Sequence, residues 1–187
     1  MSELIKPKSV HLSKSEPERA YVSVRRVAYF AVLTAIAVIL SIIESMLPLP
    51  APAPGVKLGL ANMVTLILLL DEPNPICAIG VTVLRCLLSS LLSGVFSTLL
   101  FSMAGGLISC ILMWFLLHFN YTFSPIGISV AGAIAHNAVQ LGIASLIART
   151  PAVFGYLPIL LISGIVAGVA TGIITVRTRK IFTILNR

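Results

Sequence analysis

The chain has 187 residues, of which 58% are hydrophobic and only 10% are charged, and its mean hydropathy is +1.06. This apolar fraction excludes an ordinary soluble domain, and the length leaves no room for a separate soluble catalytic domain. The formal net charge is +7. Because the basic residues gather at the two ends of the chain and not over a soluble face, the charge does not indicate nucleic-acid binding.

The distribution of charge predicts three parts: a polar cytoplasmic arm at 1–26, a transmembrane domain at 27–176 and a basic cytoplasmic tail at 177–187. Basic residues precede the first apolar stretch and follow the last one: Lys6, Lys8, Lys14, Arg19, Arg25 and Arg26, then Arg177, Arg179, Lys180 and Arg187. By the positive-inside rule, both termini are expected in the cytoplasm. Two cytoplasmic termini require an even number of membrane crossings.

Six apolar stretches predict an all-α polytopic bundle of about six transmembrane helices, because ~20 apolar residues match the ~30 Å hydrocarbon core of a bilayer. The stretches are 27–47, 58–70, 76–92, 95–117, 126–147 and 154–176. The second is too short to cross alone. The segment 48–57 before it contains four prolines, which forbid a helix. We expect this loop to dip to membrane depth and to pack on protein.

Small residues recur at a spacing of four in two of the predicted helices. Gly164, Gly168 and Gly172 form one ridge, and Ala31 and Ala35 form a shorter one. Such ridges let helix backbones approach each other closely in lipid. The glycine triple predicts packing inside the bundle, whereas a single alanine pair is equally well explained by chance.

Two charged residues, Glu44 and Arg85, lie within apolar stretches. A charge in the bilayer core is costly, so each needs a partner, water or a ligand. One interpretation is a polar cavity that opens outward, in which Arg85 binds an anionic group of a substrate. The alternatives are that Glu44 and Arg85 pair with each other, or that Glu44 reaches the outer headgroups.

The fifth stretch carries hydrogen-bonding side chains. Ser129, Ala133, His136 and Gln140 share one helical face, and Asn137 follows His136. This pattern favours recognition of a polar small molecule by His136, Asn137 and Gln140 in a mostly apolar pocket. Hydrogen bonds between helices are the alternative explanation.

Two further residues complete the candidate site. Asn62 and Lys57 flank the start of the second stretch, where Lys57 either closes over a ligand or extends outward to the headgroups. Gly105 and Gly106 interrupt the fourth stretch with small residues, and a ligand or a helix can approach closely there.

Several motifs are absent from the sequence. It contains no phosphate-binding loop with a Walker lysine, so the chain is not expected to hydrolyse ATP itself. With six acidic residues and no aspartate-rich clusters, it is not expected to hold Mg²⁺ on a diphosphate. We therefore predict no catalytic residues, no metal and no cofactor.

Four blocks of the sequence resemble a known bacterial family. They are 54–62 (PGVKLGLAN), Arg85 with 88–89, 102–106 (SMAGG) and 132–140 (GAIAHNAVQ). This is the "Gx transporter" family, which is also labelled heptaprenyl diphosphate synthase component I. Its members are similar in size and span pattern to the substrate-binding S components of energy-coupling factor transporters.

The resemblance implies a multi-pass protein of the bacterial inner membrane with a small-molecule substrate. It also implies a transmembrane coupling subunit and ATPase subunits as partners, and Ala31 and Ala35 match the motif by which S components dock. The second family name implies an alternative, an accessory membrane subunit of heptaprenyl diphosphate synthase in isoprenoid synthesis.

Overall fold

The computed structural model describes residues 16–46, 59–72, 74–119 and 123–185, and the elements in these ranges are all helical. In chain order they are α1 (Glu16–Met46), α2 (Asn62–Asp71), α3 (Pro75–Ser93), α4 (Ser97–Phe119), α5 (Pro125–Ala148), the 3₁₀ helix η1 (Pro151–Tyr156) and α6 (Leu157–Leu185). By length and composition, five spans in this part of the chain can cross a membrane, and α2 is the short exception. The predicted all-α membrane bundle is confirmed.

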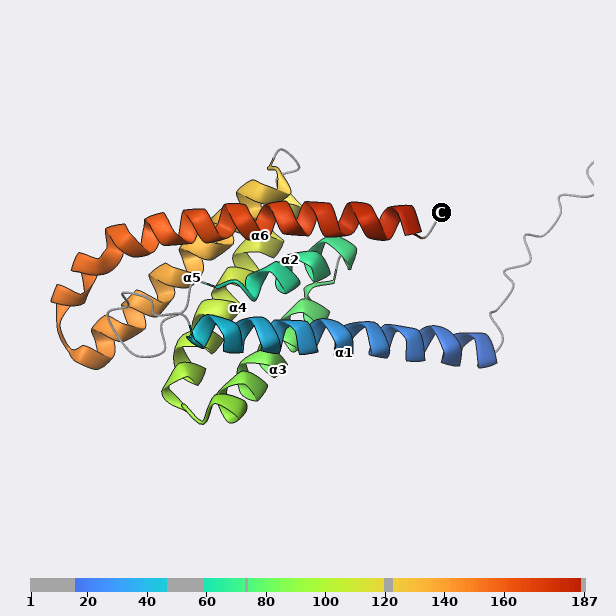
Figure 1. Ribbon diagram of the computed structural model, residues 1–187, viewed down its shortest axis with the longest axis horizontal. Helices are drawn as coiled ribbons and strands as arrows, with labels where there is room; N and C mark the ends of the chain where they lie inside the picture. The colour runs from blue at the N-terminus through green and yellow to red at the C-terminus, as the bar shows by residue number, and fades with distance from the viewer. Residues whose placement is uncertain (1–15, 47–58, 73, 120–122, 186–187) are drawn as a thin grey trace, which may run out of the picture.

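The two longest helices, α1 and α6, run along opposite sides of the bundle in Figure 1, with α2 between them. Within the described residues α1 and α6 each contact α2 but do not contact each other. The start of α1 and the end of α6 lie at the same end of the bundle (Figure 1).

Local sequence signals explain where the helices begin and end. The side chain of Asn74 accepts a hydrogen bond from the backbone N–H of Ile76 at 3.0 Å, and Pro75 occupies the first turn of α3. Gly94 ends α3 in the left-handed conformation, with φ 67°, as is common after a helix. Ser124 caps α5 in the same way as Asn74 caps α3.

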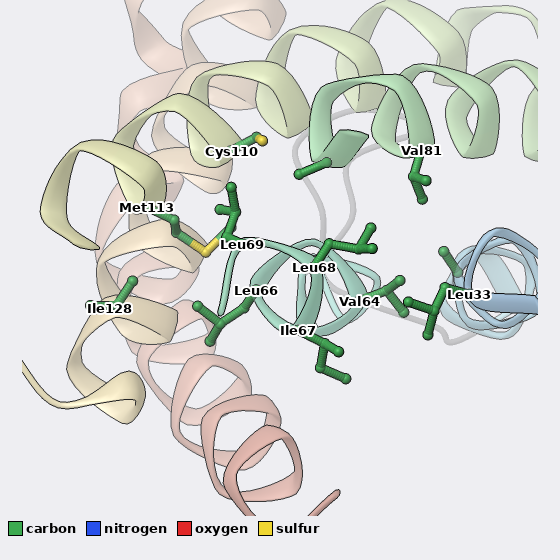
Figure 2. Close-up of a cluster of buried hydrophobic side chains, with 12 residues drawn as sticks. Leu33, Val64, Leu66, Ile67, Leu68, Leu69, Val81, Cys110, Met113 and Ile128 are labelled. Atoms are coloured by element: carbon green, nitrogen blue, oxygen red, sulfur yellow. The ribbon is translucent and has the colours of Figure 1, made fainter. Parts of the chain in front are cut away.

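The hydrophobic core is built around α2, which has buried apolar side chains on every side, as Figure 2 shows. A helix that is apolar all round has to be enclosed by other elements. Its neighbours include Leu33 of α1, Val81 of α3, Cys110 and Met113 of α4 and Ile128 of α5. The helix has 10 residues, which corresponds to about 15 Å. Because protein encloses it, α2 does not need to span the bilayer.

Helices α5 and α6 are held together by the predicted glycine ridge. A Cβ atom on Gly168 would lie 2.6 Å from Cα of Val130, and one on Gly172 would lie 2.8 Å from Cα of Ile126. Both neighbours are backbone atoms of α5, so only glycine permits this approach. The predicted role of the ridge in internal packing is confirmed.

Ion pairs hold α1 and α6 to the end of α2. Arg26 pairs with Glu72 at 2.9 Å, and Arg179 pairs with Asp71 at 2.9 Å. The hydroxyl of Tyr29 also donates to Asp71 at 2.6 Å. The first half of α1 and the last part of α6 are therefore each joined to the end of α2.

The outer helices continue beyond the predicted transmembrane domain. Helix α1 begins at Glu16, inside the stretch assigned to the polar arm, and α6 runs to Leu185, inside the basic tail. The division at 26/27 and 176/177 thus separates apolar from polar sequence but does not coincide with the helix ends, and it remains a prediction as a domain boundary.

Removing the carboxylate of Glu72 is expected to have a small effect. The Arg26 side chain is 62% exposed, and an exposed pair typically contributes about 0.2–1 kcal/mol. We expect Glu72→Gln to lower the free energy of unfolding in mixed micelles by less than about 1 kcal/mol. Asp71→Asn, which weakens contacts to both Arg179 and Tyr29, should cost more. The reverse order would contradict this assignment.

Candidate binding site

Arg85 lies in the middle of α3 with only 3% of its surface exposed. Its Nη2 donates to Oδ1 of Asn62 at 3.1 Å, and its Nη1 donates to the hydroxyl of Ser41 at 3.4 Å. Both acceptors are neutral. Its Nε has no hydrogen-bond partner among the described residues. The buried cation is therefore held by neutral groups, with one donor position left over.

Asn62, the first residue of α2, connects three helices. Its Oδ1 accepts the bond from Arg85, and its Nδ2 donates to the hydroxyl of Ser109 on α4 at 3.0 Å. The residue is 4% exposed. The side-chain amide thus fixes the guanidinium of α3 relative to the start of α2 and to α4.

The carboxylate of Glu44 holds the chain just before α2. It accepts hydrogen bonds from the backbone N–H of Gly59 and from that of Leu60. Gly59 has φ 89°, a conformation that favours glycine. The carboxylate lies near the positive end of the α2 dipole, where an anion is stabilised. Glu44 of α1 therefore holds the turn that leads into α2, whose own N-cap, Ala61, makes no side-chain hydrogen bond.

Two consecutive glycines of α4, Gly105 and Gly106, leave space for the side chains of His136 and Arg85. A Cβ on Gly105 would lie 2.9 Å from Nδ1 of His136, and one on Gly106 would lie 3.0 Å from Nη2 of Arg85. Gly59 also approaches two of these side chains closely. Its Cβ would lie 3.0 Å from the side chain of Asn62 and 3.2 Å from that of His136. Arg85 and His136 are thus placed around the same small region of the bundle.

His136 and Gln140 extend this region along α5. The Nε2 atoms of the two side chains are 2.9 Å apart, within hydrogen-bonding distance, and both residues are buried. They lie one turn apart on the same face of the helix, as the sequence predicted.

We call these groups the arginine cluster: Ser41, Glu44, Asn62, Arg85, Ser109, His136 and Gln140. Helices α1 to α5 all contribute to it. The structure brings together five of the residues predicted from the sequence to bind a substrate: Glu44, Asn62, Arg85, His136 and Gln140.

Two polar residues of α5 face α6. Nδ2 of Asn137 donates to the carbonyl oxygen of Leu160 at 2.8 Å, and the hydroxyls of Ser129 and Thr171 are 2.9 Å apart. For Asn137 and Ser129 the structure shows the interhelical bonds that were the alternative explanation of the polar face.

Other candidate positions lie away from the cluster or outside its description. Lys57 belongs to the segment outside the described residues, as does the rest of the predicted Pro-rich loop. Ala31 and Ala35 are exposed on α1, on a face that no other helix of the described chain covers. Their predicted role in docking a partner stays a prediction.

Two members of the cluster, Ser41 and Ser109, were not predicted. Both follow from helical spacing: Ser41 precedes Glu44 by three residues, and Ser109 follows Gly105 by four. A search for hydroxyls on the same helix face as each candidate residue would have found them.

The chemistry of the cluster is that of recognition. It offers a guanidinium, an imidazole, two amides, two hydroxyls and the carboxylate of Glu44, which accepts hydrogen bonds from the backbone N–H of Gly59 and Leu60. Among the described residues, no group of three or more His, Cys, Asp or Glu side chains could hold a metal ion. A guanidinium whose direct hydrogen-bond acceptors are neutral can bind one anionic group of a small molecule, and the polar side chains near it can orient the rest of that molecule.

Comparison with known proteins identifies the family. The family model described as heptaprenyl diphosphate synthase component I matches residues 33–178, a range that contains the whole arginine cluster. No curated protein and no solved structure matches the chain. Since the family model covers most of the sequence, the chain belongs to the heptaprenyl diphosphate synthase component I family.

Proposed function

We propose that the chain is a membrane-embedded subunit that binds a small anionic molecule among its helices, like an S component of an energy-coupling factor transporter. The observation that carries this proposal is the guanidinium of Arg85, buried at membrane depth between the neutral acceptors of Asn62 and Ser41.

The energetic argument concerns the unliganded protein. A buried charge loses its hydration, and neutral hydrogen-bond acceptors restore only part of that loss. An anionic group bound beside Nε of Arg85 would supply the opposite charge and accept the remaining hydrogen bond. His136 and Gln140 would then set the orientation of the ligand.

Transport would require partners. A transmembrane coupling subunit and ATPase subunits would supply the energy, and the exposed face with Ala31 and Ala35 suits close docking of another helix. The basic residues at the shared end of α1 and α6 favour a cytoplasmic position for that end in a bacterial cell, by the positive-inside rule.

The family name favours a second function, that of an accessory subunit of heptaprenyl diphosphate synthase. In this function the chain would recruit or regulate a catalytic partner at the membrane and would need no catalytic residues of its own.

Two measurements separate these functions. Native mass spectrometry of the detergent-purified chain should reveal a retained anionic metabolite if the chain is a binding subunit. Adding the purified chain to a soluble prenyl-diphosphate synthase should leave chain elongation unchanged in that case. Stimulated elongation with no retained small molecule would favour the accessory subunit.

A methyl group at Gly106 is expected to disturb ligand binding. Its Cβ would lie 3.0 Å from Nη2 of Arg85, so the guanidinium has to shift by a few tenths of an ångström. We expect Gly106→Ala to weaken retention of the metabolite at least tenfold by native mass spectrometry. Gly80→Ala, on the open face of α3, is the matched control and should retain it. Equal retention by both variants would place the ligand elsewhere.

A further inference from the structure

The basic residues at the shared end of α1, α2 and α6 fall into two groups. Arg26 and Arg179 pair with the acidic end of α2. Their sequence neighbours Arg25, Arg177 and Lys180 are exposed and form no ion pair with any described residue. Arg26 and Arg179 join the helices. The role of the other three residues, which we call the outward cations, is not explained by these ion pairs.

The surface around the outward cations indicates their depth in the membrane. Arg25 lies between Val24 and Val27, which are 68% and 64% exposed. Arg177 follows Val176, which is 41% exposed. Exposed valines face lipid in a membrane bundle, so the outward cations lie at the rim of the lipid-facing surface, at the ends of the predicted spans. At this depth the nearest anions are the phosphates of lipid headgroups.

We propose that Arg25, Arg177 and Lys180 form a binding surface for anionic phospholipid headgroups, in two patches that flank the end of α2. Guanidinium and ammonium groups bind phosphate oxygens through charge-assisted hydrogen bonds. The carboxylates of Asp71 and Glu72 lie between the patches, and Arg179 and Arg26 neutralise them, so they do not repel an anionic lipid. This surface is separate from the arginine cluster and does not depend on the proposed function.

The test compares two triple variants of the full-length chain. In Arg25→Gln/Arg177→Gln/Lys180→Gln the three charges are removed, and in Arg25→Lys/Arg177→Lys/Lys180→Arg they are kept. Binding of phosphatidylglycerol to the purified chain is measured by lipid titration and native mass spectrometry. Each cation near a membrane surface contributes about fivefold, so the glutamine variant should bind about a hundredfold more weakly. The charge-keeping variant should bind within about threefold of the wild type, since the contribution follows the charge.

Several controls keep the test decisive. Thermal unfolding in phosphatidylcholine should be the same for both triple variants. If the glutamine triple does not insert, Arg25→Gln and Lys180→Gln alone should each weaken binding about fivefold.

Three results would overturn the proposal. The first is equal binding of phosphatidylglycerol by the wild type and the glutamine variants, which would leave the cations for a protein partner. The second is a loss of binding in the charge-keeping variant, because the surface would then depend on shape and not on charge. The third is inorganic phosphate competing with the lipid at equal concentration, which would indicate a site for a soluble anion.

Discussion

Arg85→Met is expected to abolish retention of the bound anion while costing the unliganded protein less stability than the loss of one partner of a buried ion pair. The two properties separate because the guanidinium has only neutral partners, Asn62 and Ser41, in the described structure. Removing a buried charge from a well-matched ion pair costs about 3–5 kcal/mol, since its partner is left uncompensated. Here the direct acceptors of the guanidinium, Asn62 and Ser41, are neutral, so most of that cost does not arise.

The amide of Asn62 needs its own control. Without Arg85 its Oδ1 is left without that donor, which costs about 1–3 kcal/mol for a buried acceptor. The double variant Arg85→Met/Asn62→Leu removes both partners and should recover most of this loss. Stability is measured by unfolding in mixed micelles after the ligand is removed by dialysis, and retention by native mass spectrometry.

A structural role for Arg85 gives the opposite pattern. The single variant would then lose several kcal/mol, the double variant would not recover it, and a ligand present in the wild type would still be retained by any protein that folds. That outcome would remove Arg85 from the binding site and with it the proposal of an anionic ligand.

Gly168→Ala is expected to lower the free energy of unfolding by about 1–3 kcal/mol or more, because the new methyl group meets backbone atoms and cannot be accommodated by rotating a side chain. The Cβ would lie 2.6 Å from Cα and 3.0 Å from N of Val130. Helices α5 and α6 have to separate, which also strains the bond from Asn137 to Leu160.

Gly142→Ala is the matched control for this effect. It lies on the same helix pair, and its Cβ would meet nothing within 4 Å. Because alanine favours the helix over glycine, this variant should be neutral or more stable by up to about 1 kcal/mol. Both free energies are measured by detergent-induced unfolding. Equal effects of the two substitutions would mean that the close approach of α5 and α6 contributes little to stability.

Hydropathy predicted the helices well because it reports contact with lipid and core. The stretches 76–92 and 126–147 differ by one residue at each end from α3 (Pro75–Ser93) and α5 (Pro125–Ala148). It did not predict that α1 begins at Glu16, since a helix can continue from apolar into polar sequence. Nor could it place α2 at the centre, because apolar sequence alone does not say which neighbours enclose it.

The candidate site was predictable to the extent that burial of polar groups in lipid is costly. Glu44 and Arg85 were selected on that ground, and His136 was selected because it belongs to a hydrogen-bonding helix face; all three belong to the arginine cluster. The orientation of neighbouring residues was not predictable. Consecutive residues of a helix point about 100° apart, so Asn137 faces α6 although His136 faces the cluster. Only the packing of the other helices decides which of the two side chains faces the cluster and which faces α6.

The order of the residues in the chain has a consequence for biogenesis. Arg85 is the most costly residue for the translocon to insert, at about 2.5–3.5 kcal/mol near the centre of a helix. Its two acceptors, Ser41 and Asn62, both precede it in the chain. Both acceptors have therefore already been synthesised when α3 leaves the translocon. Arg85 can then form hydrogen bonds to α1 and α2 before α4 to α6 are made.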